Sequence, residues 1–324
     1  MPLISKFRKI AISGLLFLGL LGCSNGDEGG DVIQPGKTIA NFIESNPDYS
    51  SLNAALILTN LKTTFAGDVE YTLFAANNAA FNTFLSENGF ANLNAVPVEI
   101  LTQELLNHVL PGKVLAANLF TGYVETAATL SPGAHNLSMY INVGDEVIIN
   151  GLAEVNTTDL AVDNGVIHTV NSVISLPDIT TFVMADPELE IFAAALTREE
   201  DFSFVSLLHN RETPAPFTVF APNNEAFIDL LVELDAASMD EISANELLAL
   251  LGYHLIAGKN IRSADFIHGL VITTIETGML TINTTGGISL LDENGRISNV
   301  IATNVQATNG VVHLINRVLL PEMD

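Results

Sequence analysis

The apolar and polar positions of this chain follow a helical period in some stretches and a strand-like pattern in others. Residues 39–56 and 98–110 place apolar side chains three and four positions apart, which predicts amphipathic helices. Short runs rich in β-branched and aromatic residues follow, such as TLFA at 72–75 and the longer β pattern that leads to residue 174. Since helices come first and most strands later, the pattern predicts an α+β fold.

The same order of elements is written twice along the chain. Four landmarks recur: NFIESNPDYSSLNAAL at 41–56 and TFVMADPELEIFAAAL at 181–196, YTLFAANNAAF at 71–81 and FTVFAPNNEAF at 217–227, NHVLPGK at 107–113 and YHLIAGK at 253–259, and NGVIHTVNSVI at 164–174 and NGVVHLINRVL at 309–319. Four landmarks in one order indicate a tandem duplication of a globular unit. We therefore predict two domains, at 37–177 and 178–324, with little freedom in the short segment between them.

Polar residues mark the ends of the predicted elements. Asn77 and Asn223 follow the first buried strand of each copy. We expect them to cap the next helix, because an asparagine side chain accepts hydrogen bonds from the first free N–H groups of a helix. Gly165 and Gly310 each follow an asparagine between two β runs. These Asn-Gly pairs predict hairpin turns, since both residue types accept a positive φ.

The N-terminal segment has the pattern of an export signal and is excluded from the fold. Within residues 1–22, a basic stretch at 6–9 precedes an apolar run that is too short to span a bilayer comfortably. The only cysteine, Cys23, follows directly, and the sequence LLGC resembles the lipobox of bacterial lipoproteins. That resemblance implies a covalent lipid on Cys23, export, and an outer-membrane anchor with exposure at the cell surface. Residues 23–36 are rich in glycine and acid, which predicts a flexible tether.

Charge excludes one class of partner. The 324 residues carry 12 basic and 37 acidic side chains, for a formal net charge of −25. Nucleic acid binding depends on basic side chains that neutralise phosphates, so DNA and RNA are not expected as partners. Docking of the domains on an anionic membrane surface is disfavoured for the same reason, and contact with the bilayer is expected through the acyl anchor alone.

Four histidines recur across the duplication and were considered as metal ligands. His108 and His254 lie on apolar helix faces, and His168 and His313 lie in apolar β runs. None has the spacing of a metal-binding motif, so we expect structural histidines, no metal and no cofactor besides the lipid. The chain also lacks the GxSxG and SxxK patterns of nucleophilic enzymes, so no catalytic residue is predicted. An enzyme is not expected, and a hydrolase is the third alternative for function.

The landmarks of the second copy resemble those of a known family. TVFAPNNEAF, YHLIAGK and NGVVHLINRVLLP are similar, in order and spacing, to three landmarks of the fasciclin domain. The resemblance covers about residues 38–321 and implies that each domain is a twisted β-sandwich or wedge packed with helices. The first copy departs from the pattern: Ala76 stands where the second copy has Pro222, and Asn107 stands where the family usually has a tyrosine.

The resemblance also implies a class of function. Fasciclin domains are extracellular adhesion and matrix modules, and their Tyr-His region is implicated in integrin recognition in animal members. Tyr253 and His254 match that region in the second copy, and only His108 does so in the first, which makes these three the candidate partner-binding residues. The alternative is that they cap a core helix. Because the chain has no tryptophan and only five tyrosines, it offers little aromatic surface for stacking sugars.

The sequence therefore predicts a membrane-anchored adhesion lipoprotein with two tandem fasciclin domains. The expected partner is an extracellular-matrix component, a polysaccharide or another envelope protein. The main alternative is a structural module that contacts envelope proteins and has no extracellular ligand.

Overall fold

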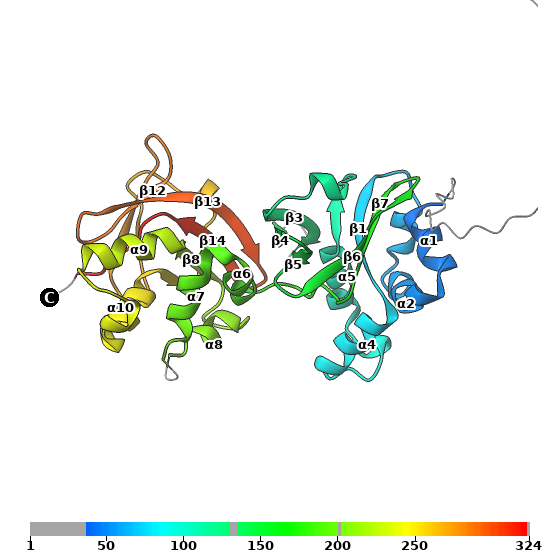
Figure 1. Cartoon of the computed structure of the whole chain (residues 1–324), viewed down its shortest axis with the longest axis horizontal. Helices are drawn as coiled ribbons and strands as arrows, with labels where there is room; N and C mark the ends of the chain where they lie inside the picture. The colour runs from blue at the N-terminus through cyan, green and yellow to red at the C-terminus, as the bar shows by residue number, and fades with distance from the viewer. Residues whose placement is uncertain (1–36, 130–134, 200–201, 323–324) are drawn as a thin grey trace, which may run out of the picture. The chain divides into compact units, whose positions relative to one another are not determined.

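A computed structural model describes residues 37–129, 135–199 and 202–322 of the chain (Figure 1). The predicted signal peptide at 1–22 and the tether at 23–36, with Cys23, lie outside these residues. The described parts contain two copies of one arrangement of helices and strands, and both copies belong to one compact unit. Among the helices that the structure describes, none is both long enough and apolar enough to cross a membrane.

The first domain begins with a group of short helices and continues into a sheet. Its helices are α1 (Ile39–Ser45), α2 (Ser50–Leu58), α3 (Lys62–Phe65), α4 (Asn78–Glu87) and α5 (Val98–Asn107), with short 3₁₀ turns at Pro47–Tyr49, Leu93–Ala95 and Ala116–Asn118. Its strands are β1 (Tyr71–Ala76), β2 (Val109–Pro111), β3 (Gly122–Thr129), β4 (Asn136–Val143), β5 (Val147–Ile149), β6 (Ala153–Val162) and β7 (Gly165–Val170).

The second domain repeats this order element by element. Its helices are α6 (Ile179–Ala185), α7 (Glu190–Thr197), α8 (Phe204–His209), α9 (Asn224–Glu233) and α10 (Ala244–Tyr253), with 3₁₀ turns at Pro187–Leu189, Met239–Glu241 and Ser263–Asp265. Its strands are β8 (Phe217–Pro222), β9 (Leu255–Ala257), β10 (Val271–Thr273), β11 (Met279–Asn283), β12 (Ser289–Leu291), β13 (Ile297–Ala307) and β14 (Gly310–Ile315).

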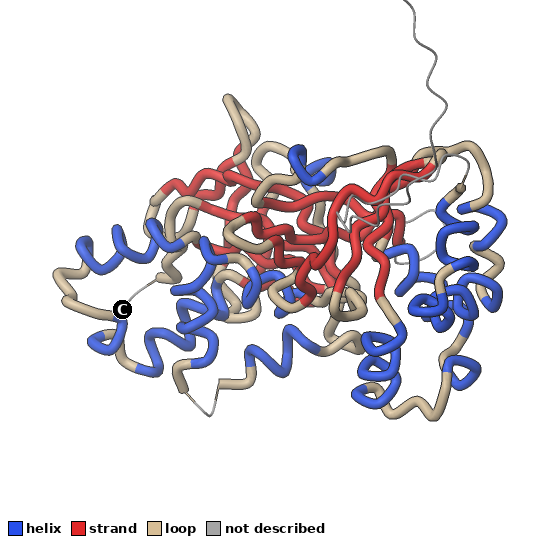
Figure 2. The backbone as a smooth tube through the Cα atoms, turned by 45° about the vertical axis from the view of Figure 1, so that its right-hand side comes forward, coloured by secondary structure: helices blue, strands red, loops and turns tan. Residues whose placement is uncertain are grey.

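Each domain contains a seven-stranded sheet with the same topology. The strand orders are β2-β1-β7-β6-β5-β4-β3 and β10-β11-β12-β13-β14-β8-β9, which are the same order read from opposite edges. The central pairs β1–β7 and β8–β14 are parallel, and the other pairs are antiparallel. Figure 2 shows the strands gathered together with the helices packed beside them. The α+β prediction and the expectation of two tandem domains are confirmed.

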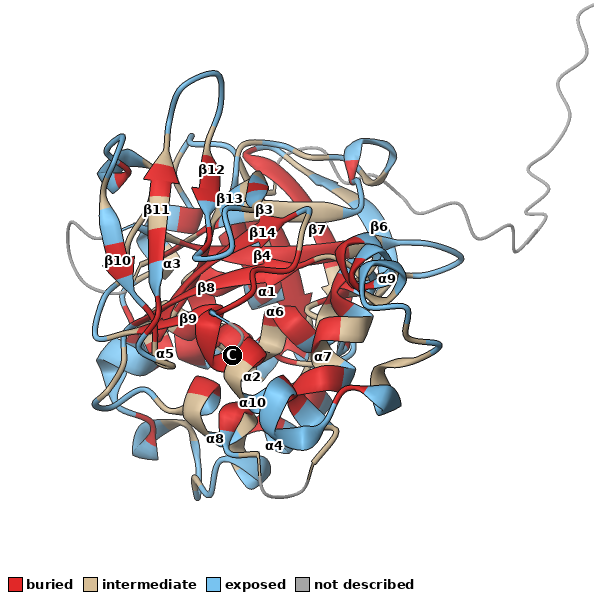
Figure 3. Cartoon of the chain, turned by 90° about the vertical axis from the view of Figure 1, so that its left-hand side faces the viewer, coloured by how far each residue is buried: buried red, intermediate tan, exposed pale blue. Residues whose placement is uncertain are grey.

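The buried residues are concentrated in the central strands and the helices that face them (Figure 3). In β1 and β8 the burial is almost continuous, as expected for strands covered on both faces. Phe81 and Phe227, in the first turn of α4 and α9, are both almost completely buried. Asn77 and Asn223 lie at the N-caps of these helices, where their side chains accept hydrogen bonds from Ala80 N and Ala226 N at 2.9 Å and 3.0 Å.

The hairpin before the last strand differs from the prediction in its position. The turn residues precede the glycine, and Gly165 and Gly310 already pair as the first residues of β7 and β14. Their φ angles are +145° and +158°, whereas neither preceding asparagine has a positive φ. A side chain at Gly165 would collide with the backbone carbonyl of Tyr71 in the neighbouring strand, so close strand packing and not the turn requires the glycine.

The two domains contact each other through one face of the first sheet. Tyr123 of β3 donates a hydrogen bond to the Asp186 carboxylate at 2.7 Å, and its ring lies 5.6 Å from that of Phe182, edge on. Gln306 N of β13 donates to Ser138 Oγ of β4 at 2.9 Å. These contacts agree with the expectation that the segment between the domains has little freedom.

Candidate functional site

The predicted partner-binding residues lie in the core of each domain. Tyr253 and His254 have no exposed surface, and His108 is 3% exposed. The Tyr253 hydroxyl donates to Met279 O at 2.7 Å and accepts from Glu293 N at 3.1 Å, so it links α10 to the start of β11 and to the β12–β13 turn. This geometry favours the alternative in which the Tyr-His pair stabilises the end of a core helix. Direct contact with a partner is not proposed for these residues.

His108 and His254 end the helices α5 and α10 as C-caps. Each Nδ1 lies 2.7 Å from the carbonyl oxygen four residues earlier, and each Nε2 accepts a backbone N–H from the segment that follows the last strand, at 2.8 Å and 3.0 Å. Nδ1 must therefore carry the proton in both rings. Burial disfavours the charged imidazolium and lowers the pKa of both histidines to about 4.

His168 and His313 satisfy a β-bulge in each domain. The registers of β6–β7 and β13–β14 shift near Asp159 and Asn304, which both have a positive φ. The backbone N–H groups of Asp159 and Asn304 donate to His168 Nδ1 at 3.2 Å and to His313 Nδ1 at 3.5 Å. The Nε2 atom of each histidine lies within 3.0 Å of a backbone carbonyl oxygen. Burial lowers the pKa of both histidines, that of His313 to about 4. At this position a neutral imidazole ring accepts a hydrogen bond from the backbone N–H group that the bulge leaves without a partner in the neighbouring strand.

Two buried asparagines have a structural role that sequence reasoning did not find. Asn164 Oδ1 accepts from Ile39 N at 2.8 Å, and its amide group donates to Phe65 O and Gly67 O. Asn309 makes the corresponding bonds to Ile179 N, Leu208 O and Asn210 O. The side chain thus ties the first helix and the loop before the first strand to the hairpin. The sequence signal for this role is the Asn-Gly pair that recurs in both copies. The same pair is also typical of a simple hairpin turn, so it does not identify the role by itself.

The described residues contain no cluster of metal-ligating side chains. Across residues 37–129, 135–199 and 202–322, the His, Asp and Glu side chains form no group of three or more that could hold a metal ion. The four buried histidines use their ring nitrogens for backbone hydrogen bonds. They are therefore engaged in the fold.

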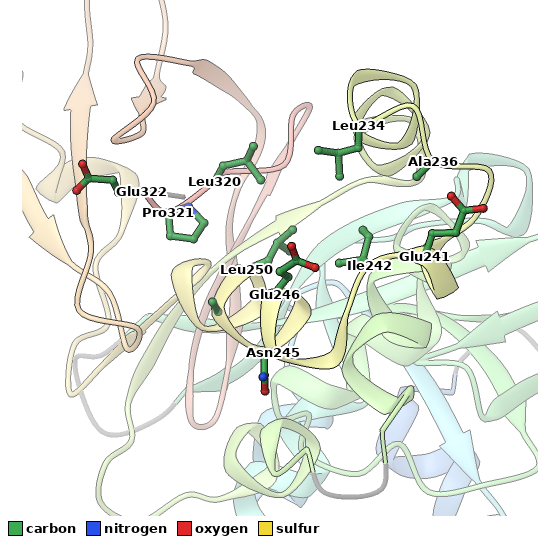
Figure 4. A pocket seen from close by; sticks show the side chains of 11 residues that line it. Leu234, Ala236, Glu241, Ile242, Asn245, Glu246, Leu250, Leu320, Pro321 and Glu322 are labelled. Carbon is green, nitrogen blue, oxygen red and sulfur yellow. The ribbon is translucent and has the colours of Figure 1, made fainter. Parts of the chain in front are cut away.

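A pocket at the end of the second domain is the strongest candidate binding site. It has a volume of about 520 Å³ and is lined by side chains from the end of α9, from α10 and from the segment after β14 (Figure 4). Ile242, Leu250 and Leu320 form its buried apolar floor. Its rim carries Glu241, Glu246 and Glu322, all of which are exposed, and no basic residue.

Local hydrogen bonds favour the ionised form of Glu246 on the rim. Glu246 accepts from Ser243 N at 3.0 Å in a capping box, and this bonding to Ser243 lowers the pKa of the Glu246 carboxyl. An ionised carboxylate beside an apolar floor is complementary to a ligand that has an apolar part and a positively charged end. The polar side chains of the lining are Asn245 and the three glutamates.

The first domain carries a larger side chain at the position that corresponds to Ala236. Phe90 occupies the position of Ala236, as shown by equivalent hydrogen bonds from Phe90 N to Leu85 O and from Ala236 N to Leu231 O. The Phe90 ring lies 6.5 Å from Phe84 and packs on the core of the first domain. The second domain therefore has a methyl group at the edge of its pocket where the first domain has an aromatic ring.

Glu104 is a second difference at this place in the fold. It takes the position of Leu250, since His108 and His254 each bond to the carbonyl of that residue. The Glu104 carboxylate accepts from Leu176 N at 3.0 Å, and Arg211 of the second domain donates to Leu176 O at 3.0 Å. Burial raises the pKa of Glu104 to about 7, against the opposing effects of the Leu176 hydrogen bond and the Arg211 charge.

Comparison with known proteins identifies the family. The model of the fasciclin domain matches residues 47–177 and 187–321. The chain belongs to the fasciclin domain family. These matches fall within the two domains of the fold, and fasciclin domains are typical of cell-adhesion or extracellular proteins.

Several curated proteins are similar to this chain over most of its length. A fasciclin-like arabinogalactan protein of Arthroderma benhamiae is 27% identical over 304 residues, covering 89% of this chain and 68% of that protein. Human periostin is 25% identical over 299 residues, or 89% of this chain and 32% of periostin. The transforming growth factor-beta-induced protein ig-h3 of Sus scrofa is 28% identical over 81% of this chain and 36% of that protein. The chain thus spans about a third of the last two relatives.

A solved structure of a similar domain pair is also found. It is the FAS1 domain pair of the insect cell adhesion molecule fasciclin I, which aligns with 87% of this chain and 95% of that chain. The TM-score is 0.48 and the sequence identity is 20%.

Proposed function

We propose that this protein is a non-catalytic adhesion protein, anchored to the outer membrane by a lipid on Cys23 and exposed at the cell surface. The observation that carries the proposal is that the two fasciclin domains account for almost all of the described chain. Their buried histidines and asparagines are engaged in the fold. The remaining chemistry lies on the surface, as in a binding protein.

The pocket beside α10 is the proposed contact site for the ligand. Its acidic rim and apolar floor select an apolar side chain that is flanked by lysine or arginine. A protein component of the extracellular matrix with a basic segment fits this chemistry better than a neutral polysaccharide, which has no cation to pair with Glu241 and Glu246. The alternative is a structural envelope module whose partner is another envelope protein.

Anchoring and exposure can be tested on intact cells. The Cys23→Ala chain should move from the membrane to the soluble exported fraction and lose acyl labelling, and surface protease should digest the wild-type protein on whole cells. Persistent membrane association of Cys23→Ala would contradict the anchor. Resistance of the wild type to external protease, with digestion after lysis, would favour the envelope alternative.

Ligand binding can be tested with the exported Cys23→Ala chain coated on beads. Adhesion to extracellular matrix should fall with added salt, since the proposed contact pairs charges. Ala236→Phe, which places in the second domain the ring that Phe90 supplies in the first, should abolish adhesion without unfolding the chain. Ile57→Phe, at an exposed position on α2, is the matched control and should adhere as wild type. Salt-insensitive adhesion that survives Ala236→Phe would remove the pocket from the proposal.

A further inference from the structure

The outer faces of the two sheets can be compared position by position through their strand registers. Tyr123 pairs with Tyr140 across β3 and β4, and Val271 pairs with Thr281 across β10 and β11. The next strands continue the match, because β4–β5–β6 and β11–β12–β13 are antiparallel in the same order. Tyr123 and Val271 therefore occupy equivalent sites, as do Tyr140 and Thr281.

In the first domain this face is covered by the second domain. Tyr123 bonds to Asp186 and packs edge on against Phe182, both from the α6 region. Tyr140 is 2% exposed and belongs to the hydrophobic cluster of the second domain. The face therefore serves as a docking surface for the beginning of a fasciclin domain.

In the second domain the equivalent face is open to solvent and uncharged, with apolar residues beside Thr273 and Thr281. Val271 is 53% exposed, Met279 54%, Leu291 38% and Ile297 53%. The residues that alternate with the buried positions in β10, β11 and β12 include no ionisable side chain. Figure 3 shows this alternation of exposed and buried positions along β10. An uncharged face is unusual on a chain with a net charge of −25 and indicates an interaction surface.

The element that covers the first face has a counterpart at the start of the chain. Phe182 and Asp186 of the α6 region correspond to Phe42 and Asn46 of the α1 region in the duplicated sequence, and both Asn46 and Asp186 cap the following 3₁₀ turn. Phe42 is only partly buried, with its ring 6.0 Å from Tyr49. An apolar ring is thus partly exposed at the end of α1.

Charge at the edge of the two surfaces is complementary. At the domain junction, Ala185 lies so close to the β5–β6 turn that a Cβ on Gly151 would be 3.1 Å from the Ala185 side chain. The counterpart of Ala185 is the exposed Ser45, whose hydroxyl accepts from Lys37 Nζ at 3.3 Å. The counterpart of the β5–β6 turn is the β12–β13 turn, which carries the exposed Glu293 and the partly buried Arg296. Arg296 is paired with Glu233, and Glu293 accepts a hydrogen bond from Met279 N at 2.9 Å, at the edge of the face. Docking in the same manner places Lys37 beside Glu293.

We propose that the outer face of β10–β12 binds the α1 end of a second copy of this chain, in the way that the first domain binds α6. Phe42 of the incoming copy packs against Val271 and Thr281, and Lys37 pairs with Glu293. The two surfaces are different parts of the molecule, so the contact is heterologous and leaves both ends of a dimer free. Copies therefore associate head to tail beyond the dimer.

Sedimentation velocity of the exported Cys23→Ala chain, from micromolar to millimolar concentration, tests the proposal. The chain should form dimers, trimers and longer species as concentration rises. Val271→Glu blocks the sheet face, because it buries a carboxylate against an aromatic ring, and should weaken association by more than about tenfold. Ser45→Trp blocks the α1 end at an exposed position and should have the same effect. Ile57→Glu, at an equally exposed apolar position, should associate like the unmodified chain.

Mixing the two blocked variants distinguishes this contact from others. Val271→Glu retains a functional α1 end and Ser45→Trp retains a functional sheet face, so an equimolar mixture should give dimers and nothing larger. If Ser45→Trp alone still forms dimers, the sheet face contacts itself and the head-to-tail proposal is wrong. A chain that stays monomeric at millimolar concentration, or a mixture that gives no dimer, also overturns it. Circular dichroism of each variant confirms that the folds are intact.

Discussion

In the first domain, Phe90 packs on the hydrophobic core, and Glu104 of α5 bonds to the segment that leads into the second domain. Beside α10 of the second domain, Ala236 and Leu250 occupy these positions and leave a pocket of about 520 Å³. The sheet faces differ in the same way, since one is covered at the junction and the other is open. The same fold therefore forms an interdomain contact surface in the first copy and leaves the equivalent surfaces exposed in the second copy.

The features that do not differ are the buried polar residues. Asn164 and Asn309, His108 and His254, and His168 and His313 make equivalent hydrogen bonds in the two domains. Because each satisfies backbone groups that no strand or helix partner reaches, the fold depends on them in both copies. The comparison therefore separates a shared frame from surfaces that diverged after the duplication.

The shared frame is tested most strongly at the two asparagines. Asn164→Ala and Asn309→Ala should each lower the free energy of unfolding by about 3–5 kcal/mol, because each strands one buried N–H and two carbonyl groups. Denaturant unfolding of both variants measures the losses. Asn41→Ala, at an exposed position on α1, should change stability by less than about 0.5 kcal/mol. If Asn164→Ala or Asn309→Ala lowers the free energy of unfolding no more than Asn41→Ala does, the fold does not depend on that asparagine.

The divergence of the two copies is tested next by pH. The pKa of Glu104 is raised from 4.5 to about 7 in the folded chain, so the folded state holds this proton more tightly than the unfolded state. Its stabilising contribution is complete below pH 4.5 and is lost as pH rises through 7, by up to about 3 kcal/mol. Glu104→Gln keeps an acceptor for Leu176 N and cannot ionise. The difference in thermal stability between Glu104→Gln and wild type should therefore grow from pH 4.5 to 8.

The histidines contribute a pH dependence of opposite sign, which Glu104→Gln leaves in place. The pKa of His108, His254 and His313 is lowered to about 4, so the unfolded chain takes up protons more readily below pH 6.5. Their contribution is present above pH 6.5 and is lost as pH falls toward 4. A wild-type minus Glu104→Gln difference that is flat between pH 4.5 and 8 would show that Glu104 titrates normally.

The bulge histidines should cost less than the asparagines. His168→Ala and His313→Ala are expected to lower stability by about 1–4 kcal/mol each, by leaving a cavity and unpaired backbone groups. His268, which is exposed, supplies the matched control and should tolerate alanine. Unmoved stability together with loss of a bound metal or ligand would reverse the structural assignment.

The duplicated pattern made most of the fold predictable from the sequence. Helical periodicity located α5 and α10, and the Asn77 and Asn223 caps followed from the preference of asparagine for free N–H groups. The Asn-Gly pairs predict turns and nothing more, because a local rule cannot show that Asn164 bonds to Phe65 and Gly67, far away in the sequence.

The candidate site was less accessible to sequence reasoning. The resemblance drew attention to Tyr253 and His254, whose burial depends on loops contributed by β11 and the β12–β13 turn. Ala236 at the pocket and Val271 on the open sheet face look unremarkable in a list of apolar residues. Only the register between the two copies shows that each replaces a ring.

The smallest expected effect concerns the pocket itself. Ala236→Phe should raise stability by about 1 kcal/mol, because a ring placed as Phe90 is placed would cover Ile242, Leu250 and Leu320 and remove apolar surface from water. The reverse change, Phe90→Ala, should lower stability by about 2 kcal/mol and open an equivalent hollow in the first domain. Paired thermal unfolding of the two variants measures both effects. If Ala236→Phe is destabilising instead, the α9–α10 loop cannot admit a ring, and the two copies differ there in backbone path as well as in side-chain size.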